Sequence, residues 1–318
     1  MSKTLVTARV SVGGYKMPKY NPKYWFDDIP VIGKMTPSEA ARKLQEIGVV
    51  DSGVKVTRGR GEKRWGWSDK PEPWQYTSHT FGFIPVSNLN SSNPVEIKHA
   101  GNIEPDQSLK NSRIKITLDR LRVFNYPGGG IHFILFDFYA QNQIEGQTEH
   151  LHFNQIYRVQ GGEQAGIIGY PIFVGLNVGS EGIAFKCFTV NVKNEDDEKL
   201  LEFLEGDTFK GGLKLIETVN PLVPIISSVA VGLTKMIASR NKNIPVQDFY
   251  MGLDFTKTPT RARLSQGSYI AVQIPEAEKW DWSKWVFNPV NGQIVSKDKP
   301  NETISYNYLV FSVSTVND

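Results

Sequence analysis

Residues 113–140 read RIKITLDRLRVFNYPGGGIHFILFDFYA, and this stretch decides the fold class. Apolar and polar residues alternate from Ile114 to Leu118, which is the period of a strand with one solvated face. Pro127-Gly128-Gly129-Gly130 then predicts a turn. Residues 131–139 are apolar at both parities, as in a strand that is covered on both faces. The stretch therefore predicts two strands joined by a turn, with the second strand central in its sheet.

More strand-like runs follow along the chain. The parity of the apolar residues changes between Leu118 and Leu121, so we predict a β-bulge at Asp119 and Arg120. Asn291-Gly292 lies between two apolar runs and predicts a hairpin. The remaining predicted strands are 151–159, 172–178, 183–192, 213–219, 249–255, 269–274, 285–290, 293–295 and 304–313.

Successive strands with little helix between them favour a mainly β protein, an antiparallel β-sandwich of jelly-roll or C2-like type. Two inserted helices are predicted at 194–204 and 221–239, where apolar residues recur with a period of 3.6. Residues 113–143 resemble a hairpin of C2-type sandwiches, but the calcium-binding aspartates of that family are absent. The resemblance implies a fold and no function.

The N-terminal part has a different character. Thr36-Pro37-Ser38-Glu39 is a capping box with proline at the first helical position, and it predicts a helix that ends at Gly48. A polar, broken stretch at 87–112 predicts a domain boundary. We expect a basic α+β domain or extension at 1–95 and the β-sandwich at 105–318.

Charge and cysteine content narrow the class of protein. The net charge is +3, made of +6 over residues 1–90 and −3 over the rest, so an anionic partner is expected to meet the N-terminal part. Cys187 is the single cysteine, which excludes an internal disulfide and predicts a buried, inert thiol. The first residues lack the pattern of a secretory signal. We expect a cytoplasmic protein.

The sequence contains no strong enzymatic motif. It lacks a Gly-x-Ser-x-Gly elbow, a phosphate-binding glycine loop, a His-Glu-x-x-His helix and paired cysteines. An enzyme whose site is assembled from distant residues stays possible in principle. We expect a non-enzymatic binding or assembly module without a cofactor, whose partner is another protein or a second copy of itself.

His150 and His152 are the best candidates for metal ligands. On a strand both imidazoles point to the same face, and His132 on another strand could add a third nitrogen. The pair resembles the cupin metal motif, in which a glutamate follows; here Asn154 and Gln155 stand near that place. The competing interpretation is a pair of hydrogen-bonded histidines in a sheet.

Two clusters combine rings with polar or cationic side chains. The candidate binding residues are Arg58, Arg60, Lys63, Arg64, Trp65, Trp67 and Trp74 in a basic aromatic loop at 55–74, and Trp280 and Trp282 near the C-terminus. Cations neutralise phosphates and indoles stack on bases, so the loop suits single-stranded nucleic acid. Flat indole faces also suit sugars. The alternative is that both clusters are lids packed over the ends of the sandwich.

The predicted helix at 221–239 offers a third route to a partner. Its apolar stretch spans roughly 15 residues, whereas a membrane-spanning helix needs about 20, so no transmembrane helix is predicted. An amphipathic helix with cations at its end suits anionic lipid, which would make the protein a lipid-binding or pore-forming effector. A helix that packs on the sheet explains the same pattern.

The basic aromatic loop gives a test of nucleic-acid binding. Each of Arg58, Arg60, Lys63 and Arg64 that neutralises a phosphate should, when replaced by alanine, lower the slope of log affinity against log salt by about 0.7 for a single strand. Trp65→Ala and Trp67→Ala should weaken binding by about 1–3 kcal/mol per stacked base and leave the slope unchanged. Titrations of labelled single strands measure both. Absence of binding at low salt would contradict this alternative.

Overall fold

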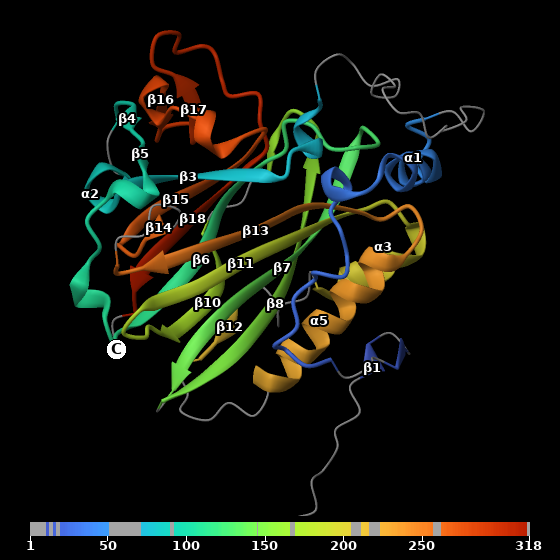
Figure 1. Cartoon of the computed structure of the whole chain (residues 1–318), viewed down its shortest axis with the longest axis horizontal. Helices are drawn as coiled ribbons and strands as arrows, with labels where there is room; N and C mark the ends of the chain where they lie inside the picture. Colours follow the sequence, from blue (N-terminus) through green and yellow to red (C-terminus); the bar gives the residue numbers. More distant parts are fainter. Residues whose placement is uncertain are drawn as a thin grey trace, which may run out of the picture.

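The structure is a computed structural model that describes most of the chain. The described residues are 11–12, 15–16, 20–50, 71–89, 92–144, 146–165, 169–204, 211–215, 223–256 and 262–316. Strands account for 45% of the protein and helices for 21%, and two large sheets face each other (Figure 1). The prediction of a mainly β chain, consistent with a β-sandwich with few helices, is confirmed.

The first sheet of the sandwich has eight strands. They are β3 (Ser78–Pro85), β5 (Lys98–His99), β6 (Arg113–Arg122), β9 (Gln164–Ala165), β10 (Tyr170–Asn177), β12 (Leu213–Lys214), β15 (Gly267–Ile274) and β18 (Tyr308–Thr315). Their order is β12-β10-β6-β18-β15-β3-β5, and β9 pairs with β6. All these pairs are antiparallel except that of β10 with β12.

The second sheet has five strands. They are β7 (Ile131–Ile144), β8 (Gln147–Gln160), β11 (Gly182–Val192), β13 (Ile244–Asp254) and β14 (Ala262–Arg263), in the order β14-β13-β11-β7-β8. The inner face of β7 packs against the eight-stranded sheet, where the ring centroid of Phe138 lies 6.1 Å from that of Phe311 in β18. Its outer face, with Leu135, belongs to a second apolar cluster. The prediction of a strand covered on both faces is confirmed.

A smaller sheet lies on the outer face of the eight-stranded sheet. Its strands are β4 (Val95–Glu96), β16 (Trp285–Asn288) and β17 (Gln293–Ser296), in the order β17-β16-β4. Phe287 and Ile294 pack there against Ile84 and Ile270. The hairpin predicted at Asn291-Gly292 joins β16 and β17, and Gly292 adopts φ +67°. A separate pair is formed by β1 (Ser11–Val12) and β2 (Tyr15–Lys16).

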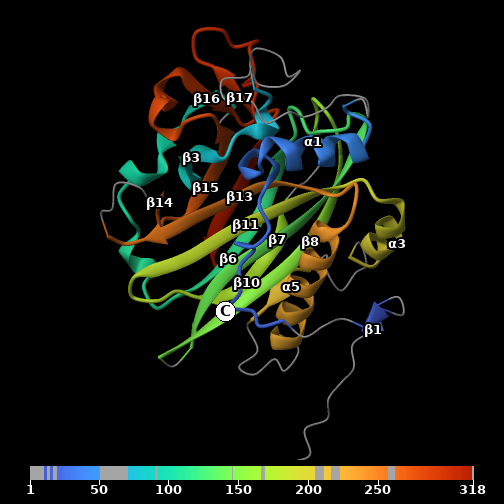
Figure 2. The same ribbon diagram turned by 45° about the vertical axis from the view of Figure 1, so that its right-hand side comes forward.

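The helices lie outside the sandwich. Among the described residues, the α-helices are α1 (Pro37–Glu46), α2 (Val86–Leu89), α3 (Glu195–Leu204) and α5 (Val223–Ser239). The 3-10 turns there are η1 (Ile32–Lys34), η2 (Pro73–Gln75), η3 (Ala100–Asn102), η4 (Gln107–Leu109), η5 (Ala277–Lys279) and η6 (Trp282–Lys284). Thr36 and Glu39 form the predicted capping box at the start of α1. The two predicted inserted helices are α3 and α5, and both contribute to the apolar cluster on the outer face of the five-stranded sheet (Figure 2).

Local details of the sheets agree with the sequence in one place and depart from it in another. Val310 of β18 lies opposite Arg120 and Phe311 lies opposite Leu118, so Asp119 is the extra residue of the predicted bulge.

Strand β3 was not predicted, because its sequence SHTFGFIP contains neither clean alternation nor a long apolar run. It lies between β15 and β5, so this sheet includes a strand from residues 1–95; the domain boundary stays a prediction.

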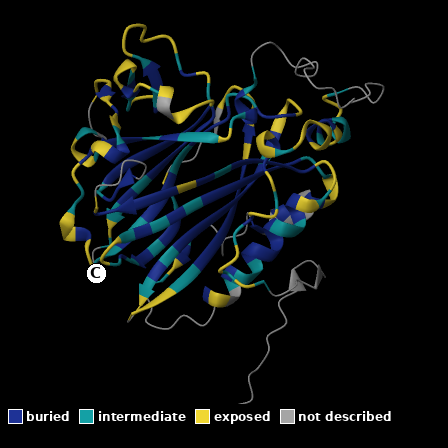
Figure 3. Ribbon diagram, viewed as in Figure 1, coloured by how far each residue is buried: buried dark blue, intermediate teal, exposed yellow. Residues whose placement is uncertain are grey.

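Much of both large sheets is buried (Figure 3), and the buried side chains include polar groups as well as rings. His132, on the inner face of β7, is 1% exposed, and its Nδ1 lies 3.3 Å from the amide oxygen of Asn191. Burial, helped by the nearby charge of Lys193, lowers the pKa of His132 to about 4. The folded protein therefore keeps this imidazole neutral through the range in which an exposed histidine gains a proton.

His132 makes stability depend on pH. Between pH 6.5 and 4 the unfolded chain binds a proton at this residue and the folded chain does not, so the free energy of unfolding falls as the pH falls. At about 1.4 kcal/mol per pKa unit the contribution approaches about 3 kcal/mol near pH 4. His132→Gln should flatten the pH dependence, which urea unfolding at several pH values measures. Equal slopes for the variant and the parent protein would contradict this account.

Candidate ligand-binding site

The predicted tryptophans Trp280 and Trp282 lie in a tight connection between β15 and β16. After Ile274 the chain passes through η5 and η6 before the hairpin begins. Asp281 fixes the second turn, because its Oδ1 accepts hydrogen bonds from the backbone N–H of Ser283 at 3.0 Å and from its hydroxyl at 2.7 Å. This capping is the usual role of aspartate before a turn. It holds the indoles on either side of Asp281 in place.

Three indoles gather at this point. The rings of Trp280 and Trp285 are stacked, with centroids 5.7 Å apart and planes 11° from parallel, and Trp282 meets Trp280 edge to face at 5.4 Å. Trp282 is the buried anchor: it is 5% exposed, and its N–H donates to Thr80 Oγ1 at 3.2 Å. Trp280 and Trp285 are half-buried, so their rings remain accessible.

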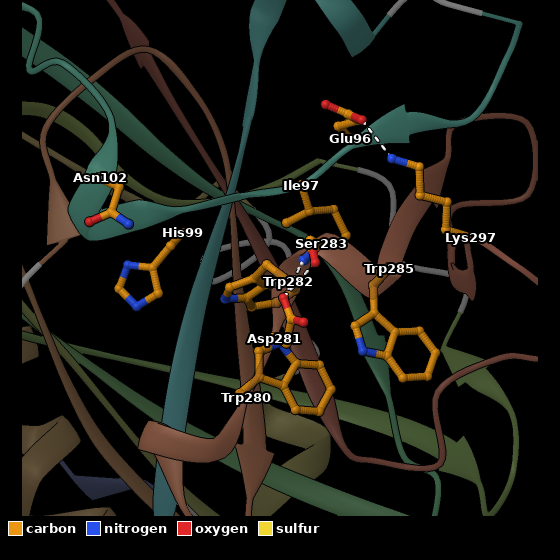
Figure 4. A pocket seen from close by; sticks show the side chains of 10 residues that line it. All are labelled: Glu96, Ile97, His99, Asn102, Trp280, Asp281, Trp282, Ser283, Trp285 and Lys297. Atoms are coloured by element: carbon orange, nitrogen blue, oxygen red, sulfur yellow. Dashed lines mark hydrogen bonds and ion pairs between the residues drawn. The ribbon is translucent and has the colours of Figure 1, made fainter.

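The indoles line a cavity of about 440 Å³, within the ~300–1,000 Å³ of small-molecule sites. Its other lining residues are Glu96, Ile97, His99, Asn102, Asp281, Ser283 and Lys297. His99 and Asn102 lie on one side of it, and Trp285 and Lys297 on the other (Figure 4). We name this cavity the tryptophan pocket.

The charged groups of the tryptophan pocket are held in their ionised forms. Hydrogen bonds from Ser283 lower the pKa of Asp281. Glu96 and Lys297 form an ion pair at 2.8 Å, which lowers the pKa of the Glu96 carboxyl and raises the pKa of the Lys297 ammonium. These three groups sum to one negative charge. The pocket is therefore polar without being strongly charged.

The neutral groups add hydrogen-bond donors. Burial lowers the pKa of His99, so the ring is neutral at pH 7, and its Nδ1 accepts a hydrogen bond from the backbone N–H of Gly101 at 3.0 Å. The remaining proton is therefore on Nε2. The indole N–H of Trp280 is buried and has no hydrogen-bond partner among the described residues. A buried donor in that state costs about 1–3 kcal/mol.

The histidines singled out as metal ligands take part in a different arrangement. His150 and His152 share one face of β8, as predicted, and this is the outer face of the sheet. His150 Nδ1 lies 2.7 Å from the hydroxyl of Tyr139. His152 is fully buried, and its two ring nitrogens face Asp137 Oδ1 at 2.6 Å and the carbonyl oxygen of Pro22 at 2.9 Å. Both ring nitrogens therefore face protein oxygens at hydrogen-bond distance, and neither faces an open metal position.

His132 does not join this pair. It lies opposite Val159, whereas His152 lies opposite Tyr139; residues at odd separation on a strand point to opposite faces, so His132 faces the sandwich interior and Tyr139 the outside. Within the described part of the chain no group of three or more histidine, cysteine, aspartate or glutamate side chains could hold a metal ion. The geometry supports the interpretation of hydrogen-bonded sheet histidines.

The basic aromatic loop is largely beyond what the structure describes. Arg58, Arg60, Lys63, Arg64, Trp65 and Trp67 fall within residues 51–70, outside the described residues. Trp74 is described: it lies in η2, is 5% exposed and belongs to the main apolar core. Its ring packs inside the protein, apart from the tryptophan pocket, and nucleic-acid binding by the loop stays a prediction.

Helix α5 packs against the five-stranded sheet. It contacts β7, β8 and β11, and Val231, Leu233 and Ile237 are buried in the outer cluster. Thr234 donates a hydrogen bond to Asp137 Oδ2 at 2.9 Å. None of the helices within the described residues is long and apolar enough to cross a membrane. Release of α5 toward lipid would expose this face and break these bonds.

Most of the pocket was not predicted. Trp280 and Trp282 were, because paired indoles stand out in a sequence, but Glu96, His99 and Asn102 come from residues far away in the chain. Their closeness depends on the pairing of β4 with β16, and two-residue strands leave no periodic pattern. Comparisons with protein families, with curated proteins and with solved structures find no match for this chain.

Replacing Thr234 tests whether α5 is a fixed part of the fold. Thr234→Val keeps the shape of the side chain but removes the hydroxyl from the buried Asp137 carboxylate, so the free energy of unfolding should fall by about 1–3 kcal/mol. The matched control is Thr315→Val at an exposed position, which should change little. Urea unfolding measures both. Equal stability of the two variants would contradict a firmly docked helix and favour the lipid-binding alternative.

Proposed function

We propose that this chain is a non-enzymatic binding module whose binding site is the tryptophan pocket. The observation that carries the proposal is a cavity in which three indoles meet an ionised carboxylate and a buried indole N–H without a partner among the described residues. Concave sites with apolar walls and a few convergent polar groups are where small ligands or single side chains of a partner bind.

The protonation of the two acids supports binding rather than catalysis. Catalysis by a carboxylate pair requires one acid whose pKa is raised, so that it can donate a proton near neutral pH. In the tryptophan pocket the hydrogen bonds to Asp281 and Glu96 lower the pKa of both. Two permanent carboxylates accept hydrogen bonds and orient a ligand.

The sheet edges support a pocket as the route to a partner. Among the described strands, β5, β12 and β14 end their sheets and are two residues long. The long edge strand β8 lies beside α5, where the backbone N–H of His152 donates to Ser227 Oγ at 3.1 Å. The short end strands and the cover that α5 gives β8 disfavour strand pairing at these places. Strands β12 and β14 pair with only two residues each of β10 and β13.

A thermal-shift screen of a chemically diverse compound library tests the proposal. A ligand at 100 times its dissociation constant adds about 2.7 kcal/mol of stability, so it should raise the melting temperature of the parent protein. Trp285→Ala, which removes one accessible ring, should abolish those shifts. Val290→Ser at the exposed tip of the same hairpin should keep them. Shifts that are equal in all three proteins would overturn the assignment of the site.

A further inference from the structure

The accessible rings of the tryptophan pocket offer flat apolar surfaces in one orientation. Trp280 and Trp285 lie within 11° of parallel, and Trp282 holds Trp280 from the side through an edge-to-face contact. Trp282 in turn is anchored by its bond to Thr80 and by burial in the small sheet. A fixed pair of parallel rings suits a ligand with a flat apolar face.

The polar groups around these rings require a ligand that both donates and accepts hydrogen bonds. Asp281 uses Oδ1 for its turn, and its Oδ2 makes no hydrogen bond to the described residues, so it can accept from a ligand. Trp280 Nε1 is a donor that has no acceptor in the described structure, and His99 Nε2 carries a proton. A hydroxyl group can serve either need, because it donates one hydrogen and accepts through two lone pairs.

The charges of the pocket disfavour other flat or aromatic-binding ligands. Asp281 and Glu96 repel a phosphate, and Lys297, the ammonium among the lining residues, is already paired with Glu96. A quaternary ammonium would gain from the indole faces and from Asp281, but it has no acceptor for the Trp280 N–H. A ligand without net charge that carries several hydroxyls satisfies every group.

We infer that the tryptophan pocket binds a neutral carbohydrate. One face of a sugar ring, where its C–H groups gather, would pack on the accessible face of the Trp285 indole, which Trp280 supports by stacking. Hydroxyls of the sugar would donate to Asp281 and accept from the N–H of Trp280. This inference rests on the proposed binding function and names its ligand class. It assigns Trp285 the stacking surface, and it assigns Trp280 the support of that ring and a directed hydrogen bond.

An array of neutral glycans probed with the full-length protein tests the inference, followed by calorimetry with the best binder. Because stacking and hydrogen bonding to a neutral ligand involve no net charge, affinity should be the same at low and high salt. Trp285→Ala should weaken binding about tenfold or more. Trp280→Phe keeps a six-membered aromatic ring and loses the N–H with the five-membered ring, and should weaken binding about five- to tenfold. Val290→Ser should bind like the parent protein.

Choline and adenosine serve as comparison probes. If a tryptophan variant does not fold, Asn102→Ala replaces it, because Asn102 lines the pocket at an exposed position. Binding of choline or adenosine that Trp285→Ala or Asn102→Ala weakens, with no glycan bound, would overturn the carbohydrate inference and leave the proposed function intact. Glycan binding unchanged in all foldable pocket variants would overturn the inference too. No binding of any probe would count against both.

Discussion

The structure depends on one strand that must be buried on both faces. Strand β7 is apolar at both parities, and neither the eight-stranded sheet nor the helices alone could cover it. Its inner rings meet β18 across the sandwich, and its outer side chains require α3, α5 and the segment that contains Phe26 and Val31. The sandwich and its helical layer are therefore consequences of the same apolar run.

The burial of β7 on both faces also encloses a carboxylate side chain. Asp137 is fully buried on its outer face, and it accepts hydrogen bonds from the side chains of His152, Thr234 and Asn154. A buried carboxylate is tolerated only with such partners. The network joins β7, β8 and α5, and it contrasts with the tryptophan pocket, where a buried donor still lacks a partner in the described structure. One polar cluster is complete within the fold, whereas the other contains a donor without a partner among the described residues.

The sequence was informative wherever a residue pattern reflects one local period. The alternation around Ile116 placed β6, the change of parity placed the bulge at Asp119, and the Thr36 capping box placed α1. It was uninformative where contacts cross the chain. Strand β3 carries no clear period because Gly82 interrupts it. Glu96 lies close to Trp285 because β4 pairs with β16, and no local pattern in the sequence indicates that pairing. The indoles were visible in the sequence, but the polar half of their pocket was not.

The contact between Gly82 and Trp282 ties two distant positions to each other. A Cβ atom at position 82 would lie 2.8 Å from the ring of Trp282 and 2.5 Å from Ile97, closer than side-chain carbons approach. The indole thus rests directly on the backbone of β3, in the middle of the hydrogen-bonded ladder. A larger residue at 82 would need room from both Ile97 and Trp282, so the aromatic wall and strand β3 cannot change independently.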